Sequence, residues 1–109
     1  MTARTVDVLV VGAGPAGLAA ATRLAAAGAG RVEVVEREQQ AGGIPRHCCH
    51  GGFGLRDLHR PLSGPEYARR LVHDAVRSGA RLLTDLLQHA TAFECDEVLL
   101  EVRVDNTRA

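Results

Sequence analysis

The sequence predicts an α/β fold, in which a parallel βαβ core is followed by an antiparallel β excursion. Residues 6–11 form an almost continuously apolar, β-branched run that ends in a glycine-rich turn, and an alanine-rich segment follows it. A second valine-rich stretch, Val-Glu-Val-Val, occupies residues 32–35. A buried strand, a glycine turn, a helix and another buried strand, in this order, are typical of a parallel sheet that is covered by helices.

The glycine turn after the first strand has the spacing Gly12-x-Gly14-x-x-Gly17. Gly12 allows the tight turn, Gly14 leaves room where the backbone approaches a pyrophosphate, and Gly17 lets the next helix pack closely against the sheet. Pro15 suits the first turn of that helix, whose N-terminus offers unpaired N–H groups. We therefore expect a partial Rossmann-like domain that binds the phosphates of a dinucleotide at Gly12, Gly14, Pro15, Ala16 and Gly17.

The first predicted helix is the alanine-rich segment, and Gly28 is placed to end it. The second strand, 32–35, is followed directly by Glu36, which lies 19 residues after Gly17. An acidic residue at this position accepts hydrogen bonds from the ribose hydroxyl groups, and it would repel a 2′-phosphate. Arg37 is the only residue that favours a cofactor with a 2′-phosphate. We discount it, because Glu36 occupies the position that contacts the ribose.

A second helix is predicted over residues 66–77. Ser63 and Glu66 have the spacing of a capping box, in which each side chain bonds the backbone N–H of the other residue. Gly79 is placed to end this helix. The residues expected on or near its apolar face are Tyr67, Leu71, Val72 and Val76.

The remaining predicted strands are a third parallel strand at 81–84 and two antiparallel strands at 91–93 and 98–104. Apolar and charged residues mostly alternate in 98–104, which is the pattern of a strand with one buried face. A chain of 109 residues is shorter than the doubly wound sheet that this fingerprint usually opens, because that sheet needs two mononucleotide halves. The chain is therefore expected to be a truncated part of a larger domain.

Several stretches of the chain resemble a known group of flavoproteins. Residues 8–20 are similar to the FAD-binding fingerprint of flavoproteins with two dinucleotide-binding domains, in which a second fingerprint binds NAD(P)H. Other stretches are similar to FAD/NAD(P)-binding oxidoreductases associated with the oxidation of glycerol-3-phosphate, opines, sarcosine and hydroxyproline. These stretches are 36–38, 42–48, 52–56 and 62–71. The resemblance implies FAD as the cofactor and residues 1–109 as the N-terminal part of an FAD-binding domain.

The resemblance also implies a flavin-dependent oxidoreductase that acts on an amine, an amino acid or an alcohol, with NAD(P) or another electron acceptor. The pyridine nucleotide-disulfide oxidoreductases of this superfamily carry a redox-active Cys-x4-Cys pair after the Gly-Gly turn. The corresponding residues here are Pro45 and His50. Cys48 and Cys49 are adjacent, and disulfide geometry disfavours a bond between neighbours. The chain therefore resembles these enzymes without their redox disulfide.

The segment 42–54 is rich in glycine, which suggests backbone that runs close to a bulky flavin. We expect Gly43 and Arg46 to contact the cofactor, with Arg46 or His47 facing the pyrophosphate or the ring. An ordinary surface loop is the alternative. The run 47–50 consists only of His and Cys, but consecutive side chains diverge and make a poor tetrahedral site. We therefore assign no metal site and no catalytic residue.

The composition limits the kinds of partner and the compartment that we expect for this chain. The formal net charge is +0, so the chain has no excess of basic residues for a nucleic acid, and no unbroken apolar stretch is long enough for a membrane span. Three cysteines without a secretory segment fit a reducing compartment and a cytoplasmic location. Two alternatives to the FAD-binding assignment remain open. One is an NAD-binding module without flavin, and the other is a non-catalytic fragment that needs a partner chain to complete its sheet.

Overall fold

The computed structural model of the chain describes residues 5–86. Its elements in chain order are β1 (Val8–Val11), α1 (Pro15–Ala26), β2 (Val32–Val35), the short 3-10 helix η1 (Ile44–His47), α2 (Gly64–Arg77) and β3 (Arg81–Leu83). The predicted parallel elements are therefore present, with small shifts at their ends, and η1 is an addition that the glycine-rich sequence does not predict. The strands predicted at 91–93 and 98–104 lie outside the described residues.

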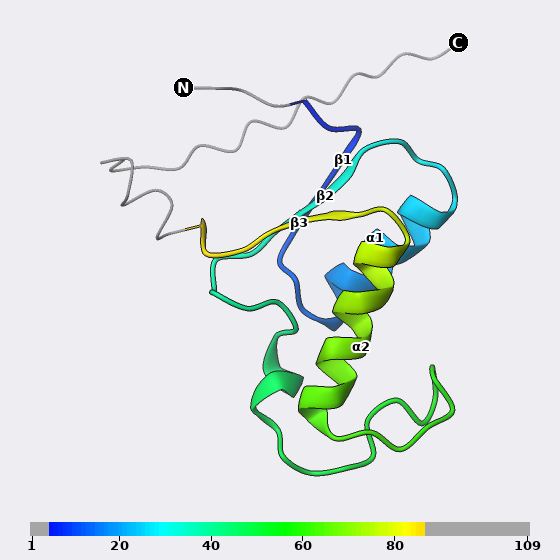
Figure 1. Cartoon of the computed structure of the whole chain (residues 1–109), viewed down its shortest axis with the longest axis vertical. Coiled ribbons are helices and arrows are strands. Elements are labelled where there is room, and N and C mark those ends of the chain that lie inside the picture. The colour runs from blue at the N-terminus through cyan, green and yellow to red at the C-terminus, as the bar shows by residue number, and fades with distance from the viewer. Residues whose placement is uncertain (1–4, 87–109) are drawn as a thin grey trace.

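The three described strands form one parallel sheet in the order β1-β2-β3 (Figure 1). Val8 of β1 is paired with Val32 of β2, and Val35 of β2 is paired with Leu83 of β3. Right-handed crossovers that proceed in one direction along a sheet place their helices on the same face, and α1 and α2 pack against each other there. This arrangement confirms the α/β class and the partial Rossmann-like fold.

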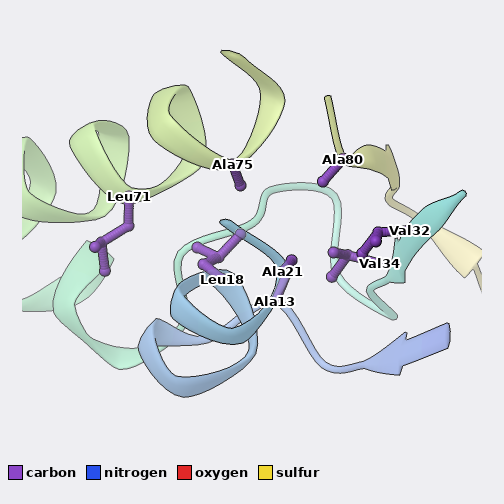
Figure 2. Close-up of a cluster of buried hydrophobic side chains, with 8 residues drawn as sticks. All are labelled: Ala13, Leu18, Ala21, Val32, Val34, Leu71, Ala75 and Ala80. Carbon is purple, nitrogen blue, oxygen red and sulfur yellow. The ribbon is translucent and has the colours of Figure 1, made fainter. Parts of the chain in front are cut away.

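The core lies between α1, α2 and β2 (Figure 2). The buried residues that form it are Ala13, Leu18, Ala21, Val32, Val34, Leu71, Ala75 and Ala80. Half of them are alanines, so the backbones approach one another closely. Leu18 and Val34 are the largest side chains that are completely buried. Truncation of either one would leave a cavity that its small neighbours cannot fill.

Both helices have the capping and terminating residues that their sequences predict, and α2 begins two residues before the predicted start. At the start of α2, Ser63 Oγ accepts a hydrogen bond from Glu66 N–H at 3.4 Å, and Glu66 Oε2 accepts one from Ser63 N–H at 3.2 Å. The capping box is therefore complete. Gly28 and Gly79 follow α1 and α2 with φ of +77° and +107°. Each glycine and the residue after it donate to carbonyls of the last helical turn, which is the Schellman arrangement.

The buried face of α2 agrees with the expected one except at Val76. Leu71 is buried and Tyr67 and Val72 are partly buried against the core, whereas Val76 is 53% exposed. Gly64, Ala68 and Ala75 are buried as well, and these small residues let α2 pack directly against α1 and η1. No helix within residues 5–86 is long and apolar enough to cross a membrane.

Candidate functional site

The glycine turn follows the carboxyl end of β1, which is the end where ligands bind in parallel α/β sheets. Gly12 has a φ of +100°, and its N–H donates a 2.9 Å hydrogen bond to Val35 O at the end of β2. A Cβ atom at Gly17 would collide with Gly12 O and would lie 3.2 Å from Val10 Cγ1. The close approach of α1 to the sheet that the sequence predicts at Gly17 is therefore present.

Gly14 and the first turn of α1 fit a phosphate group. Gly14 is the N-cap of α1, no side chain caps this end of the helix, and Pro15 follows directly. Leu18 N–H donates to Gly14 O at 3.0 Å, so the N–H groups of Ala16 and Gly17 have no carbonyl of this helix to bond. A Cβ atom at Gly14 would have no neighbour within 4 Å. The space beside its backbone is therefore open, at the positive end of the helix dipole.

The carboxylate of Glu36 lies beside this turn. Its Oε2 accepts a 2.9 Å hydrogen bond from Ala13 N–H, and its Oε1 accepts a 3.1 Å hydrogen bond from Glu38 N–H. An ionised carboxylate has about four lone-pair positions, so both oxygens can still accept hydrogen bonds from ribose hydroxyl groups. Glu36 at the end of β2 therefore keeps lone pairs that can accept further hydrogen bonds. It also belongs to the hydrogen-bond network of the glycine turn.

Ala13 is a residue of this site that the sequence pattern does not identify, because both of its polar contacts are made by the backbone. Its N–H is bonded to Glu36, and its carbonyl accepts a 2.7 Å hydrogen bond from Gly42 N–H. Its side chain is completely buried in the core. Its position between two glycines of the fingerprint is the one signal in the sequence that marks it.

The Gly42-Gly43 turn lies directly against the glycine turn. Gly43 has a φ of +68°, and a Cβ atom at this position would lie 3.0 Å from Gly14 Cα and 3.4 Å from Pro15 Cδ. A side chain at residue 43 would therefore press on the backbone beside the proposed phosphate position. The structure thus brings Gly43 next to the fingerprint glycine Gly14.

The two arginines expected at the cofactor differ in their surroundings. Arg46 Nη1 donates a 2.7 Å hydrogen bond to Gln40 O and forms a 3.4 Å ion pair with Glu38 Oε2. Its guanidinium is therefore directed to the segment after β2. Arg37 is exposed and has no hydrogen bond or ion pair with any residue of the described part of the chain. The structure thus brings Arg46, but not Arg37, into the network around Glu36.

The rest of the glycine-rich segment lies beyond η1, at the N-terminal end of α2 (Figure 1). Phe53 and Leu62 form an antiparallel bridge, and the ring of Phe53 lies between those of His50 and Tyr67, with centroid separations of 5.0 and 5.7 Å. Tyr67 also donates a 2.7 Å hydrogen bond to Asp57 Oδ2. Burial and then this carboxylate raise the pKa of the Tyr67 hydroxyl above its usual 10.0. The loop is thus attached to α2 by its own side chains.

The glycines of this loop have different surroundings. Gly54 is buried inside the loop, whereas Cβ atoms at Gly51 and Gly52 would meet nothing within 4 Å. Cys48 and Cys49 are free thiols. Within residues 5–86, no group of three or more His, Cys, Asp or Glu side chains is arranged to hold a metal ion.

A groove of about 810 Å³ lies between α2, the segment 39–41 and the end of β3. Its walls come from that segment, from Arg46, from one side of α2 that includes Ala68 and Val72, and from Leu82 and Thr84. Its lining includes no residue of the glycine turn. The open space beside Gly14 is therefore separate from this groove.

Comparisons with known proteins agree with this geometry. The chain matches the family described as FAD binding domain over residues 7–104. Its fold is similar to the crystal structure of Thermovibrio ammonificans THI4, with a TM-score of 0.61 and 26% sequence identity. That similarity covers 72% of this chain and 38% of the other, so the chain matches less than half of its neighbour's length. The comparison with curated proteins gave no match.

The family match extends over nearly the whole chain, from before the glycine turn to beyond β3. It confirms FAD as the cofactor, which the resemblance of the sequence to flavoprotein oxidoreductases implies. The uncapped N-terminus of α1 and the open space beside Gly14 are the structural features that fit the phosphates of this cofactor. The chain belongs to the FAD binding domain family.

Proposed function

We propose that this chain binds the adenosine diphosphate half of FAD in a flavin-dependent oxidoreductase. The phosphates lie at the turn between β1 and α1, and the ribose lies at the carboxylate that follows β2. The residues proposed for this site are Gly12, Gly14, Pro15, Ala16, Gly17, Glu36, Arg37, Gly43 and Arg46.

The observation that carries this proposal is the pairing of an uncapped helix N-terminus with a carboxylate on the neighbouring strand. The N-terminus of α1 has unpaired N–H donors and open space beside Gly14. Glu36 lies next to the same turn, because Ala13 N–H donates to its Oε2. The N–H donors of α1 can bind the phosphates, and the Glu36 carboxylate can bind the ribose hydroxyl groups. Phosphate and ribose are adjacent groups in adenosine diphosphate.

When bound, the flavin supplies the chemistry of hydride transfer, and the protein binds and orients it. We propose an amine, an amino acid or an alcohol as the substrate, with NAD(P) or another compound as the electron acceptor. The resemblance of 42–48 and 62–71 to oxidoreductases of that kind supports this substrate class. The described residues contribute cofactor binding, and we propose no catalytic residue among them.

Equilibrium titrations of the purified chain with FAD, NAD and ADP test the proposal. We expect FAD and ADP to bind, and FAD to bind more tightly than NAD. Tighter binding of NAD would support a flavin-free NAD-binding module instead. Binding of none of the three would support a non-catalytic fragment and would overturn the proposal for this chain.

We also propose that another subunit or chain completes the sheet beside β1. Val8 and Val10 face the core, so Val11 lies on the sheet face away from the helices, where it is 69% exposed. In the described sheet β1 is an edge strand. An edge strand that exposes a large apolar side chain favours association with a further strand.

Light scattering on the wild-type chain and on Val11→Lys tests this second proposal. We expect the wild-type chain to associate with itself or with a co-expressed partner, and the lysine variant to lose that association. A wild-type chain that stays monomeric, with the same solubility as the variant, would contradict it.

We propose a cytoplasmic location as well. Cys48 and Cys49 are free thiols in the structure, and Cys49 is exposed. Exposed thiols are maintained in a reducing compartment, which supports the cytoplasm. Fractionation of cells that express the complete gene product, followed by immunodetection, tests this location.

A further inference from the structure

We infer that Arg46 is a positioning residue, which holds Glu36 and the glycine turn in the conformation that receives the ribose. In this role its guanidinium does not contact the phosphates of the cofactor. The inference rests on the proposed binding of adenosine diphosphate at the glycine turn. It deepens that proposal, because it separates the residues that contact the cofactor from one that acts through them.

The guanidinium of Arg46 is bonded to the segment that follows β2. Its Nη1 atom donates a 2.7 Å hydrogen bond to Gln40 O and lies 3.4 Å from Glu38 Oε2. The side chain of Arg46 is 22% exposed, whereas that of Glu38 is 47% exposed. The short hydrogen bond to the carbonyl is the stronger contact, because a long ion pair with an exposed carboxylate is screened by water.

The aliphatic part of Arg46 lies beside Gly42. A Cβ atom at Gly42 would lie 2.8 Å from Ala68 Cβ and 3.6 Å from both Cγ and Cδ of Arg46. Gly42 N–H donates the 2.7 Å hydrogen bond to Ala13 O. The stem of Arg46 therefore lies, together with the Cβ of Ala68, beside the glycine that makes this bond, while its guanidinium contacts the segment after β2.

Both contacts of Arg46 lead to Ala13. Glu38 N–H, in the segment that the guanidinium holds, donates to Glu36 Oε1 at 3.1 Å, and Glu36 Oε2 accepts the N–H of Ala13 at 2.9 Å. Ala13 is thus held by Glu36 on its N–H and by Gly42 on its carbonyl. Asp85 N–H also holds this segment, through a 2.7 Å hydrogen bond to Glu38 O. Without the guanidinium, the segment loses its contacts at Gln40 O and Glu38 Oε2, and we expect the Glu36 carboxylate to rotate away from the turn more readily.

Amide hydrogen exchange of the cofactor-free chain tests this inference without any ligand. Arg46→Met keeps the stem over Gly42 and removes the guanidinium. We expect the N–H groups of Ala13 and Glu38 to exchange about tenfold faster in this variant, which corresponds to the loss of one charge-assisted hydrogen bond. Because both polar contacts are made by a single nitrogen atom, we expect Arg46→Lys to recover part of the protection.

The matched control is Arg70→Met, which removes an arginine that pairs with Asp74 on the surface of α2. We expect this variant to exchange at Ala13 and Glu38 as the wild-type chain does. The amides of β2 report whether each variant is folded. Equal exchange at Ala13 and Glu38 in the wild type and in a folded Arg46→Met variant would overturn the inference.

Titration with adenosine and with ADP distinguishes positioning from a phosphate contact. We expect Arg46→Met to raise the Kd of both ligands by the same factor of about ten, because both contain the ribose. In a Glu36→Gln background, we expect Arg46→Met to have no further effect, because both residues act on the same group. A loss confined to ADP would make Arg46 a phosphate contact and would overturn the inference. If the wild-type chain binds no nucleotide, the proposed function fails, and the exchange experiment still decides the role of Arg46.

Discussion

The backbone N–H of Ala13 donates a 2.9 Å hydrogen bond to Oε2 of Glu36. This bond joins the turn after β1 to the end of β2, across 23 positions of the sequence. The carboxylate that we propose for the ribose therefore also shapes the turn that we propose for the phosphates. A change at Glu36 is expected to affect both parts of the site.

We expect Glu36→Gln to weaken the binding of FAD by about tenfold. The amide keeps one acceptor oxygen, but it loses the charge that strengthens hydrogen bonds to the ribose, and its NH₂ group faces a backbone N–H donor. Calorimetric titration with FAD measures the change in Kd. An unchanged Kd would show that Glu36 serves the turn alone and does not contact the ribose.

We expect Gly14→Val to abolish FAD binding while the chain keeps its stability. A Cβ atom at Gly14 meets no protein atom within 4 Å, so the folded chain accepts the side chain, whereas the space for the phosphate is filled. FAD titration and thermal unfolding, measured on the same sample, check the two parts of this prediction.

Two variants serve as controls for Gly14→Val. Gly51 has equally open surroundings in the loop before α2, so Gly51→Val is expected to leave both stability and FAD binding unchanged. Gly17→Ala is expected to destabilise the fold, because its Cβ would collide with Gly12 O. FAD binding retained by Gly14→Val would exclude the proposed phosphate position.

We expect Ser63→Ala to lower the free energy of unfolding by about 1 kcal/mol, which is the typical contribution of an N-cap. The variant loses the hydrogen bond from Glu66 N–H to Ser63 Oγ. Urea denaturation measures the change, and Ser63→Asp, which keeps a capping oxygen, is expected to restore most of the stability. Equal stability of the alanine variant would mean that the capping box contributes nothing to α2.

We expect Tyr67 to ionise above the usual tyrosine pKa of 10.0, because burial and the Asp57 carboxylate both disfavour tyrosinate. The stabilisation linked to this group is complete below pH 10.0 and is lost as the pH rises through the higher pKa of the folded chain. Tyr67 is the single tyrosine, so ultraviolet absorbance follows its titration directly.

Asp57→Asn is the control for this titration. It removes the negative charge but keeps an acceptor oxygen near the hydroxyl group, so we expect the pKa of Tyr67 to fall toward its usual value. Identical titration curves for the wild type and the variant would mean that Asp57 has no part in the shift.

The parallel core could be predicted from the sequence because its signals are local. The β-branched runs at 8–11 and 32–35, the capping residues Ser63 and Glu66, and the terminal glycines Gly28 and Gly79 each act over a few residues. A pattern of this range is visible without knowledge of the tertiary contacts. The FAD assignment could also be predicted from the sequence, and the family match covers the fingerprint on which that prediction depends.

The contacts around the site could not be predicted in the same way. The sequence predicts a contact of Arg46 with the cofactor, but it does not predict the 2.7 Å hydrogen bond from its guanidinium to Gln40 O. No sequence signal marks that carbonyl as a partner, because every residue carries one. The burial of Ala68 and Ala75 and the exposure of Val76 were not predicted either, since the fit of small side chains depends on how closely the neighbouring elements approach.

The sequence by itself determined the cofactor class, the glycine turn and the acid at the end of β2, because each of these depends on residue type at a fixed spacing. Only the tertiary structure decided how they are joined. Ala13 N–H donates to Glu36, the Ala13 carbonyl accepts from Gly42 N–H, and Arg46 Nη1 donates to Gln40 O in the segment between Glu36 and Gly42. These bonds are made largely by backbone atoms that meet only when the segments after β1 and β2 fold against each other, and backbone atoms are the same in every residue.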